Sequence, residues 1–284
     1  MNHAIEIKDL TKKYGQILAL KSITLNVPVG TIYGLIGPNG AGKTTLIKAL
    51  VGAVKPSSGH LNVLGMNPIN DKWALRQKIG YMPQSAALYE DLSAKQNILF
   101  FGKAQKIENL NQKTDEVLQF VELTDRANDL VRNFSGGMKK RVSLCCALIH
   151  SPEILFLDEP TAAIDPHLKL QSWNLFRKLA NSGVTLFIST HLMDEAMHCD
   201  KVTILMNGEI IAVDTPQKII ESGKTVLTIK DNGVITTRTI ASTPEGLANE
   251  LLKLGLRASI TEISATPDTI ENIVLNIIKK NQIH

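Results

Sequence analysis

The chain has 284 residues, a net charge of +4, and 44% hydrophobic and 20% charged residues, which indicates a folded protein of about two domains. The small positive charge fits an anionic ligand or a membrane surface as well as scattered surface lysines. The longest apolar run, Leu144 to Ile149, has six residues, whereas a bilayer span needs about 20. The start of the chain does not resemble a signal peptide. Three cysteines, Cys145, Cys146 and Cys199, fit reduced thiols of a cytoplasmic protein.

Hydrophobic periodicity predicts the elements of the first half of the chain. Alternating apolar residues in 5–7 and 23–27 predict half-exposed antiparallel strands. The apolar run 31–36 predicts a buried strand, and apolar residues at helical spacing after Gly42 predict a helix that Gly52 ends. Further strands are expected at 60–64 and 79–82, and helices at 94–104, at 113–121 and from Ser135 onward.

Strand and helix patterns alternate in the second half. Strands are expected at 154–157 and 184–189 and helices at 166–180 and 193–199, an order that requires a parallel sheet covered by helices. A hairpin turn at Asn207-Gly208 joins strands at 202–205 and 209–213. After residue 220, strands are expected at 226–230, 234–240 and 258–264. Thr243 and Thr266, each followed by proline, are predicted to cap two helices.

These patterns predict two domains. Residues 1–220 form the first, which includes a helical subdomain at about 85–150, and residues 221–284 form a small β/α appendage. The appendage carries no catalytic motif, and a packing or subunit-contact role fits it best.

The segment between the strand at 31–36 and the next helix fits the phosphate-binding loop pattern, in which two glycines five positions apart precede Lys and Thr. Glycines let backbone N–H groups converge on one point, where the start of the helix adds its positive dipole end. The lysine supplies a charge for the outer phosphates, and the threonine hydroxyl can join a Mg²⁺ shell. The sequence therefore predicts a nucleoside triphosphate site formed by Gly37, Pro38, Asn39, Gly40, Ala41, Gly42, Lys43, Thr44 and Thr45.

Two acids follow the apolar strand at 154–157. A nucleotide site needs a carboxylate near Mg²⁺ at the mouth of a neighbouring strand, and Asp158 fits that position. Glu159 fits the role of a general base for an attacking water. An acid that only caps the next segment is the alternative, and Pro160 ends the strand in either case.

Five further motifs accompany the phosphate loop. They are Tyr14, which lies 23 residues before Gly37, Gln84 in Gly80-Tyr81-Met82-Pro83-Gln84, Ser135-Gly136-Gly137-Met138, Asp165 after Thr161-Ala162-Ala163-Ile164, and His191 after Ser189-Thr190. In this order and spacing, residues 1–220 resemble the ATP-binding subunit of an ATP-binding cassette (ABC) transporter. The resemblance implies a P-loop NTPase of the ABC-cassette fold, with a mixed sheet core, an antiparallel β subdomain and a helical subdomain.

The resemblance also implies the roles of these residues. Tyr14 is the platform for adenine, Gln84 touches Mg²⁺ and water and senses the membrane partner, and His191 is the switch histidine. The signature residues Ser135, Gly136 and Gly137 open a helix, whose bare N–H groups form a second anion site. In the family these residues and Asp165 act in trans, because two subunits meet head to tail and each signature covers the γ-phosphate held by the other.

Two residues depart from the family pattern. Met138 stands where the signature usually has glutamine, and this form resembles the branch that serves export-type (ABC-2) permeases. Ala163 stands where the segment before Asp165 usually has glycine, which is expected to remove the freedom to adopt a positive φ angle.

The sequence thus predicts an ATP-binding and ATP-hydrolysing subunit that uses ATP and Mg²⁺ to energise transport, with export favoured, through a separate ABC-2-type permease. It would lie at the cytoplasmic face of the membrane as a homodimer or paired with a second ABC ATPase, without nucleic acid. One alternative is a soluble ABC-type ATPase that acts on ribosomes or DNA; another is a regulatory nucleotide-binding module.

Overall fold

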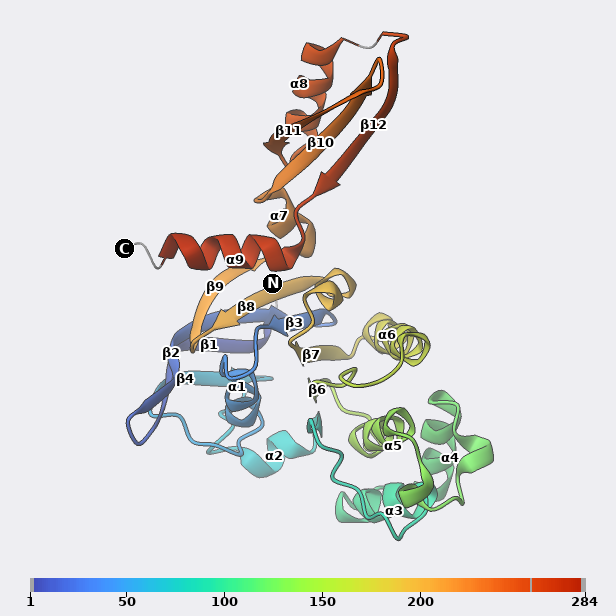
Figure 1. Ribbon diagram of the computed structural model, residues 1–284. Coiled ribbons are helices and arrows are strands. Elements are labelled where there is room, and N and C mark those ends of the chain that lie inside the picture. Colours follow the sequence, from blue (N-terminus) through green and yellow to red (C-terminus); the bar gives the residue numbers. More distant parts are fainter. Residues whose placement is uncertain (1–2, 256, 282–284) are drawn as a thin grey trace.

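The computed structural model describes residues 3–255 and 257–281. Residues 3–214 contain two sheets and the helices packed on them (Figure 1). In chain order these elements are β1 His3–Tyr14, β2 Ile17–Pro28, β3 Ile32–Ile36, α1 Lys43–Leu50, β4 Ser58–Val63, α2 Lys72–Arg76, β5 Ile79–Met82, α3 Ala94–Ala104, α4 Leu110–Phe120, the 3-10 turns η1 Thr124–Arg126 and η2 Val131–Asn133, α5 Gly136–Leu148, β6 Ile154–Asp158, α6 Pro166–Asn181, β7 Thr185–Thr190, the 3-10 helix η3 Met193–His198, β8 Lys201–Met206 and β9 Glu209–Asp214.

The central sheet has six strands in the order β5-β6-β7-β3-β8-β9. The first five run parallel and β9 is antiparallel to β8. Every residue of β3, β6 and β7 is buried, as the apolar runs predict for a sheet covered on both faces. A second, antiparallel sheet has the order β2-β1-β4. The predicted mixed sheet with an antiparallel subdomain is confirmed.

Alternate residues of the central strands face two different cores. Tyr33 and Leu35 of β3 pack into a cluster with the antiparallel sheet and α1, whereas Ile32 and Ile36 pack into a cluster with α3, α5 and α6. The parallel register brings the carboxyl ends of β3, β6 and β7 to one edge of the sheet. The loops that follow these three strands carry the phosphate loop, the two acids and His191, so the fold alone brings the predicted site residues together.

The remaining elements build the appendage and a helix that returns from it (Figure 1). They are α7 Pro216–Glu221, β10 Lys224–Asp231, β11 Val234–Ala241, α8 Pro244–Leu254, β12 Ile260–Pro267 and α9 Ile270–Asn281. The three strands form an antiparallel sheet in the order β11-β10-β12, and in Figure 1 it projects from the rest of the chain. Ile270, Ile273 and Val274 of α9 are buried in the main core cluster together with Ala196 and Ile219. The division after residue 220 remains a prediction.

Two predicted elements differ from the structure. Thr266 and Pro267 do not start a helix, because both residues pair with β10 as the end of β12. The hydroxyl of Thr269 accepts the Asn272 N–H at 3.2 Å and caps α9 instead. The predicted helix at 193–199 is the 3-10 helix η3, in which the Glu195 N–H donates to the Leu192 carbonyl three residues earlier.

None of the helices within 3–255 and 257–281 is both long enough and apolar enough to span a membrane.

We predict that the hydroxyl pair between β3 and β8 stabilises the central sheet. Tyr33 Oη and Thr203 Oγ1 lie 2.7 Å apart and both residues are fully buried. Tyr33→Phe leaves the Thr203 hydroxyl without this partner and is expected to lower the free energy of unfolding by about 1–3 kcal/mol. The double variant Tyr33→Phe/Thr203→Val should recover part of that loss in urea unfolding. Equal loss in the single and double variants would contradict this role.

Candidate nucleotide site

A cleft of about 620 Å³ lies over the phosphate loop, within the range of small-molecule sites. One wall is the loop itself and the start of α1. The opposite wall comes from β2 and from the turn between β8 and β9. The lining residues are Ile17, Leu18, Ala19, Lys21, Asn39, Gly40, Ala41, Gly42, Lys43, Thr44, Thr45, Gln84, Glu159, Asn207 and Gly208.

Two glycines of the loop stand where no side chain fits. A Cβ at Gly37 would lie 2.1 Å from the Leu205 carbonyl oxygen, and one at Gly42 would lie 2.6 Å from the Ala19 carbonyl oxygen. Gly42 also has a φ of +108°, in the region that favours glycine. Gly42 is the N-cap of α1 and no side chain caps this helix. The first turn of α1 therefore presents its N–H groups to the cleft, as an anion site requires.

Lys43 is almost fully buried at the floor of the cleft. Its Nζ donates to the Gly37 carbonyl at 2.7 Å and to the Pro38 carbonyl at 3.2 Å. The same atom lies 3.2 Å from Glu159 Oε1. These three oxygens satisfy the ammonium, and they are the partners that phosphate oxygens could replace.

Glu159 connects the lysine to the histidine. Its Oε2 lies 2.5 Å from Nδ1 of His191, while its Oε1 contacts Lys43. The side chain of Glu159 is 3% exposed and that of His191 is 37% exposed. A carboxylate buried between a cation and a ring N–H is held in one orientation, as a general base for water requires.

Asp158 lies at the end of β6 beside Glu159. Its Oδ1 accepts the Ser189 hydroxyl at 2.5 Å. Its Oδ2 is buried without a hydrogen-bond partner in the part of the chain that the structure describes. Burial, and then the charge of Asp158, raise the pKa of the neighbouring Tyr81 to about 12. A buried carboxylate oxygen without a protein partner fits a hard cation or its water, so Asp158 has the chemistry to hold Mg²⁺.

Gln84 and the loop residues 39–45 line the cleft, but Tyr14 does not. Tyr14 ends β1 and is 44% exposed, and the ammonium of Lys12 lies 4.6 Å from its ring centroid. It belongs to the hairpin whose other strand contributes Ile17 and Leu18 to the wall of the cleft. The adenine-platform role of Tyr14 stays a prediction.

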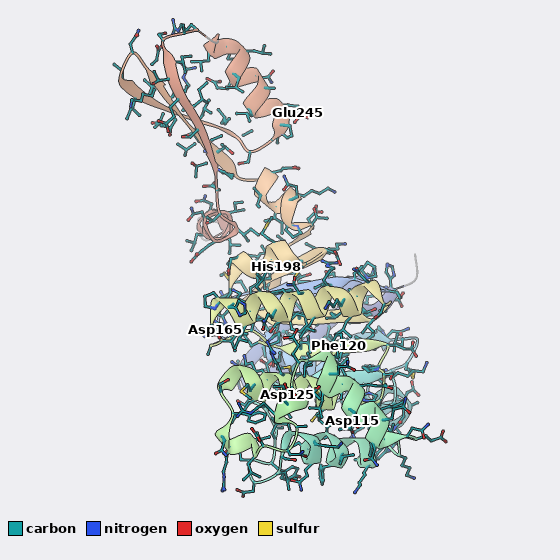
Figure 2. The ribbon with its side chains drawn as sticks, turned by 90° about the vertical axis from the view of Figure 1, so that its right-hand side faces the viewer. Asp115, Phe120, Asp125, Asp165, His198 and Glu245 are labelled. Carbon is teal, nitrogen blue, oxygen red and sulfur yellow. The ribbon has the colours of Figure 1, made fainter. Side chains whose placement is uncertain are left out.

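The residues predicted to act in trans lie outside this cleft. Ser135 caps α5 by accepting the Met138 N–H at 3.3 Å, and Gly136 is exposed with open space where its side chain would be. Asp165 caps α6 by accepting the Leu168 N–H at 3.0 Å. Figure 2 labels Asp165 at the start of α6, on the surface. The single chain thus presents a second helix start that does not reach its own cleft.

The expectation for Ala163 was wrong. Ala163 has a φ of +58° and adopts the left-handed conformation without glycine, at a cost of about 1 kcal/mol or more. Met138 packs its side chain against the main core cluster.

The sequence reasoning missed several residues of the site. Asn207 and Gly208 were recognised only as a turn, yet they line the cleft, and the Gly208 N–H donates to the Ala41 carbonyl at 3.0 Å. Lys140 was not singled out at all. Its Nζ donates to the Glu159 carbonyl at 2.8 Å and to the Ala162 carbonyl at 2.5 Å. The turn signal Asn-Gly was available in the sequence, but its position beside the phosphate loop depends on the sheet order.

Comparison with known protein families identifies the family. The family model described as "ABC transporter" matches residues 20–162. The chain belongs to the ABC transporter family. This cassette is 39% identical over 222 residues to the probable multidrug ABC transporter ATP-binding protein YbhF of Escherichia coli, covering 76% of the chain but only 38% of YbhF. It is 34% identical over 266 residues to the linearmycin resistance ATP-binding protein LnrL of Bacillus subtilis, covering 90% of the chain and 86% of LnrL.

Solved structures agree with the fold. The dimeric, post-hydrolysis structure of the ATP-binding cassette MJ0796 with ADP and Pi is 28% identical, covers 74% of this chain and 98% of that one, and has a TM-score of 0.66. A solved ATP-binding subunit of an ABC transporter is 24% identical, and the match has a TM-score of 0.72 and covers 97% of this chain and 99% of that chain. Because nearly the whole chain is matched, the fold that the two proteins share includes the appendage. The prediction that residues 1–220 belong to an ATP-binding subunit of the ABC transporter family is confirmed.

We predict that Lys43→Ala weakens ATP binding at least about tenfold, because hydrogen bonds to a charged group are worth about 1.5–3 kcal/mol. Fluorescent-nucleotide titration measures this affinity. Lys48→Ala is the matched control, since Lys48 is exposed on the same helix and does not line the cleft. Unchanged affinity of the Lys43 variant would count against the phosphate site.

Proposed function

We propose that this cassette hydrolyses ATP and uses the energy to drive export through a separate membrane permease of the ABC-2 type. The contact of Glu159 with both Lys43 and His191 at the mouth of the phosphate loop carries the proposal. Lys43 and Glu159 line the cleft, and His191 contacts Glu159 from outside it. A buried carboxylate in contact with both a cation and an imidazole suits phosphoryl transfer to water.

The chemistry follows from these contacts. Lys43, Thr44, Thr45 and the loop amides hold the triphosphate, and the phosphate oxygens replace the loop carbonyls around the Lys43 ammonium. Glu159 then orients a water and takes its proton as the water oxygen bonds to the γ-phosphorus. The bond from that phosphorus to the β-phosphate oxygen breaks, and ADP and phosphate leave. His191 holds Glu159 and the γ-phosphate in register, and the loop amides stabilise the spread negative charge.

Asp158, Thr44 and Gln84 are the residues that would hold Mg²⁺. The unpartnered Oδ2 of Asp158 supports this assignment. Bound between protein and phosphates, the ion would neutralise charge on the β- and γ-oxygens. Tyr14 is proposed as the adenine platform beside Ile17 and Leu18.

A second copy, or another ABC ATPase, would complete the site. Ser135, Gly136 and Gly137 face away from the chain's own cleft, and their helix start suits an anion. In a head-to-tail pair they and Asp165 would cover the γ-phosphate held by the partner, in line with the dimeric MJ0796 cassette. ATP would close the pair and hydrolysis would open it, a population shift that reaches the permease through the surface around Gln84.

Export is proposed because relatives named for multidrug transport, linearmycin resistance and Nod factor export share 34–39% identity with this chain. The signature with Met138 supports the ABC-2 branch. The protein would therefore lie at the cytoplasmic face of the membrane, attached through its permease. The cargo contacts would lie in that permease.

Glu159→Gln is expected to retain ATP affinity and to lower the hydrolysis rate by about 100- to 10,000-fold, the contribution of a positioned general base. Phosphate release from the purified protein with its permease measures the rate. Glu153→Gln is the control, because Glu153 directly precedes β6 at the end opposite to Glu159. Its side chain is exposed there and pairs with Lys78. An undiminished rate in the Glu159 variant would refute its role as base.

The partner assignment is tested by copurification from detergent-solubilised membranes. A tagged chain should recover a permease with about six membrane spans, and adding this permease should raise the ATPase rate. Recovery of ribosomes, or an ATPase rate that no membrane protein affects, would contradict the transport role. A chain that binds ATP but does not hydrolyse it, even with the permease, would be a regulatory module instead.

A further inference from the structure

Lys140 joins two segments of the site that are far apart in the sequence. It lies on α5, two turns or less from the helix start at Ser135, and is half-buried. Its Nζ donates to the carbonyls of Glu159 and Ala162, at 2.8 Å and 2.5 Å. One ammonium therefore connects the signature helix to the backbone of the proposed catalytic base.

The segment that Lys140 holds is a strained turn. The Ala162 N–H donates to the Glu159 carbonyl at 3.3 Å, which closes a turn that begins at the base. Glu159 has a φ of +53° and Ala163 a φ of +58°, and neither residue is a glycine. Such conformations persist only where the surroundings hold them. The ammonium of Lys140 binds both carbonyls of this turn, so it is one of the groups that hold it.

A buried carboxylate also binds the same segment. Glu195 of η3 is fully buried, and its Oε1 accepts the Thr161 hydroxyl at 2.7 Å and contacts Lys169 Nζ at 3.0 Å. Burial lowers the pKa of Lys140, and the charges of Glu159 and Glu195 partly offset this effect. The turn is therefore bound by a cation from α5 and by an anion from the segment that follows His191.

The signature helix also packs directly against α6. A Cβ at Gly137 would lie 2.8 Å from Leu168 Cδ1, so the glycine allows the start of α5 to approach the residues after Asp165. The Lys140 bonds join α5 to the turn that begins at Glu159, and this packing joins α5 to the start of α6, which follows that turn in the chain. A displacement of α5 is thus passed to the turn, because packed interiors do not deform continuously.

We infer that Lys140 is a positioning residue that couples α5, the helix that begins at the signature, to Glu159. When the nucleotide of a partner subunit binds the start of α5, this coupling would determine the position of the catalytic base in the chain's own site. This inference rests on the proposed function. It assigns Lys140 no contact with ATP, since Lys140 does not line the nucleotide cleft. A base displaced from the γ-phosphate slows the chemical step but leaves the phosphate loop intact.

The test compares Lys140→Met with Lys140→Arg and Lys139→Met. Methionine keeps the aliphatic stem without a donor, whereas arginine restores donors for two carbonyls. Lys139 is the matched control, because it is the neighbouring lysine on α5 but pairs with Glu90 at 2.6 Å instead. We expect Lys140→Met to lower kcat by about 10- to 100-fold with ATP affinity unchanged, Lys140→Arg to recover most of the rate, and Lys139→Met to match the wild type.

Hydrogen exchange provides a readout that does not depend on turnover. In the wild type, ATP should protect the amides of both 135–140 and 159–165; in Lys140→Met it should protect only the first segment. Wild-type kcat in Lys140→Met, equal loss in Lys139→Met, or protection of 159–165 in the Met variant would each overturn the inference. Absence of ATP hydrolysis in the wild type would refute the proposed function instead, while the exchange experiment would still decide the coupling.

Discussion

The buried pairing of Lys43 with Glu159 is the interaction on which the site depends. Their side chains are 5% and 3% exposed, and a charge at that depth is stable only when it is paired and hydrogen-bonded. The pair requires the ends of β3 and β6 to stand on either side of β7, which the order of the central sheet provides. It also keeps a cation and a carboxylate in contact at the floor of the cleft.

The two helix starts divide the chemistry between two faces. The start of α1 borders the cleft with Lys43, whereas the start of α5, capped by Ser135, opens elsewhere on the surface. The segment from Glu159 to Asp165 runs between them and is bonded to α5 and to η3. In the head-to-tail pair proposed above, this short turn would connect the nucleotide that a chain holds with the one that its α5 covers.

Much of the fold and site could be predicted from the sequence because their signals are local. Apolar runs predict β3, β6 and β7, and the glycine spacing predicts the loop after β3. Other features depend on tertiary contacts. Thr266 precedes a proline as a helix cap would, but strand pairing with β10 takes this residue into β12. Ala163 keeps a positive φ because its surroundings hold the turn. Lys140 lies among polar residues of a helix, and only the fold reveals which carbonyls it meets.

The return of α9 to the cassette has a consequence for biosynthesis. Ile270, Ile273 and Val274 complete a core cluster that begins with Ile32, so this core is not closed until α9 has left the ribosome. A domain normally folds as its own residues emerge. Here the apolar patch around Ala196 and Ile219 stays uncovered until α9 emerges, and a nascent chain stalled within the appendage would expose it to chaperones and to aggregation.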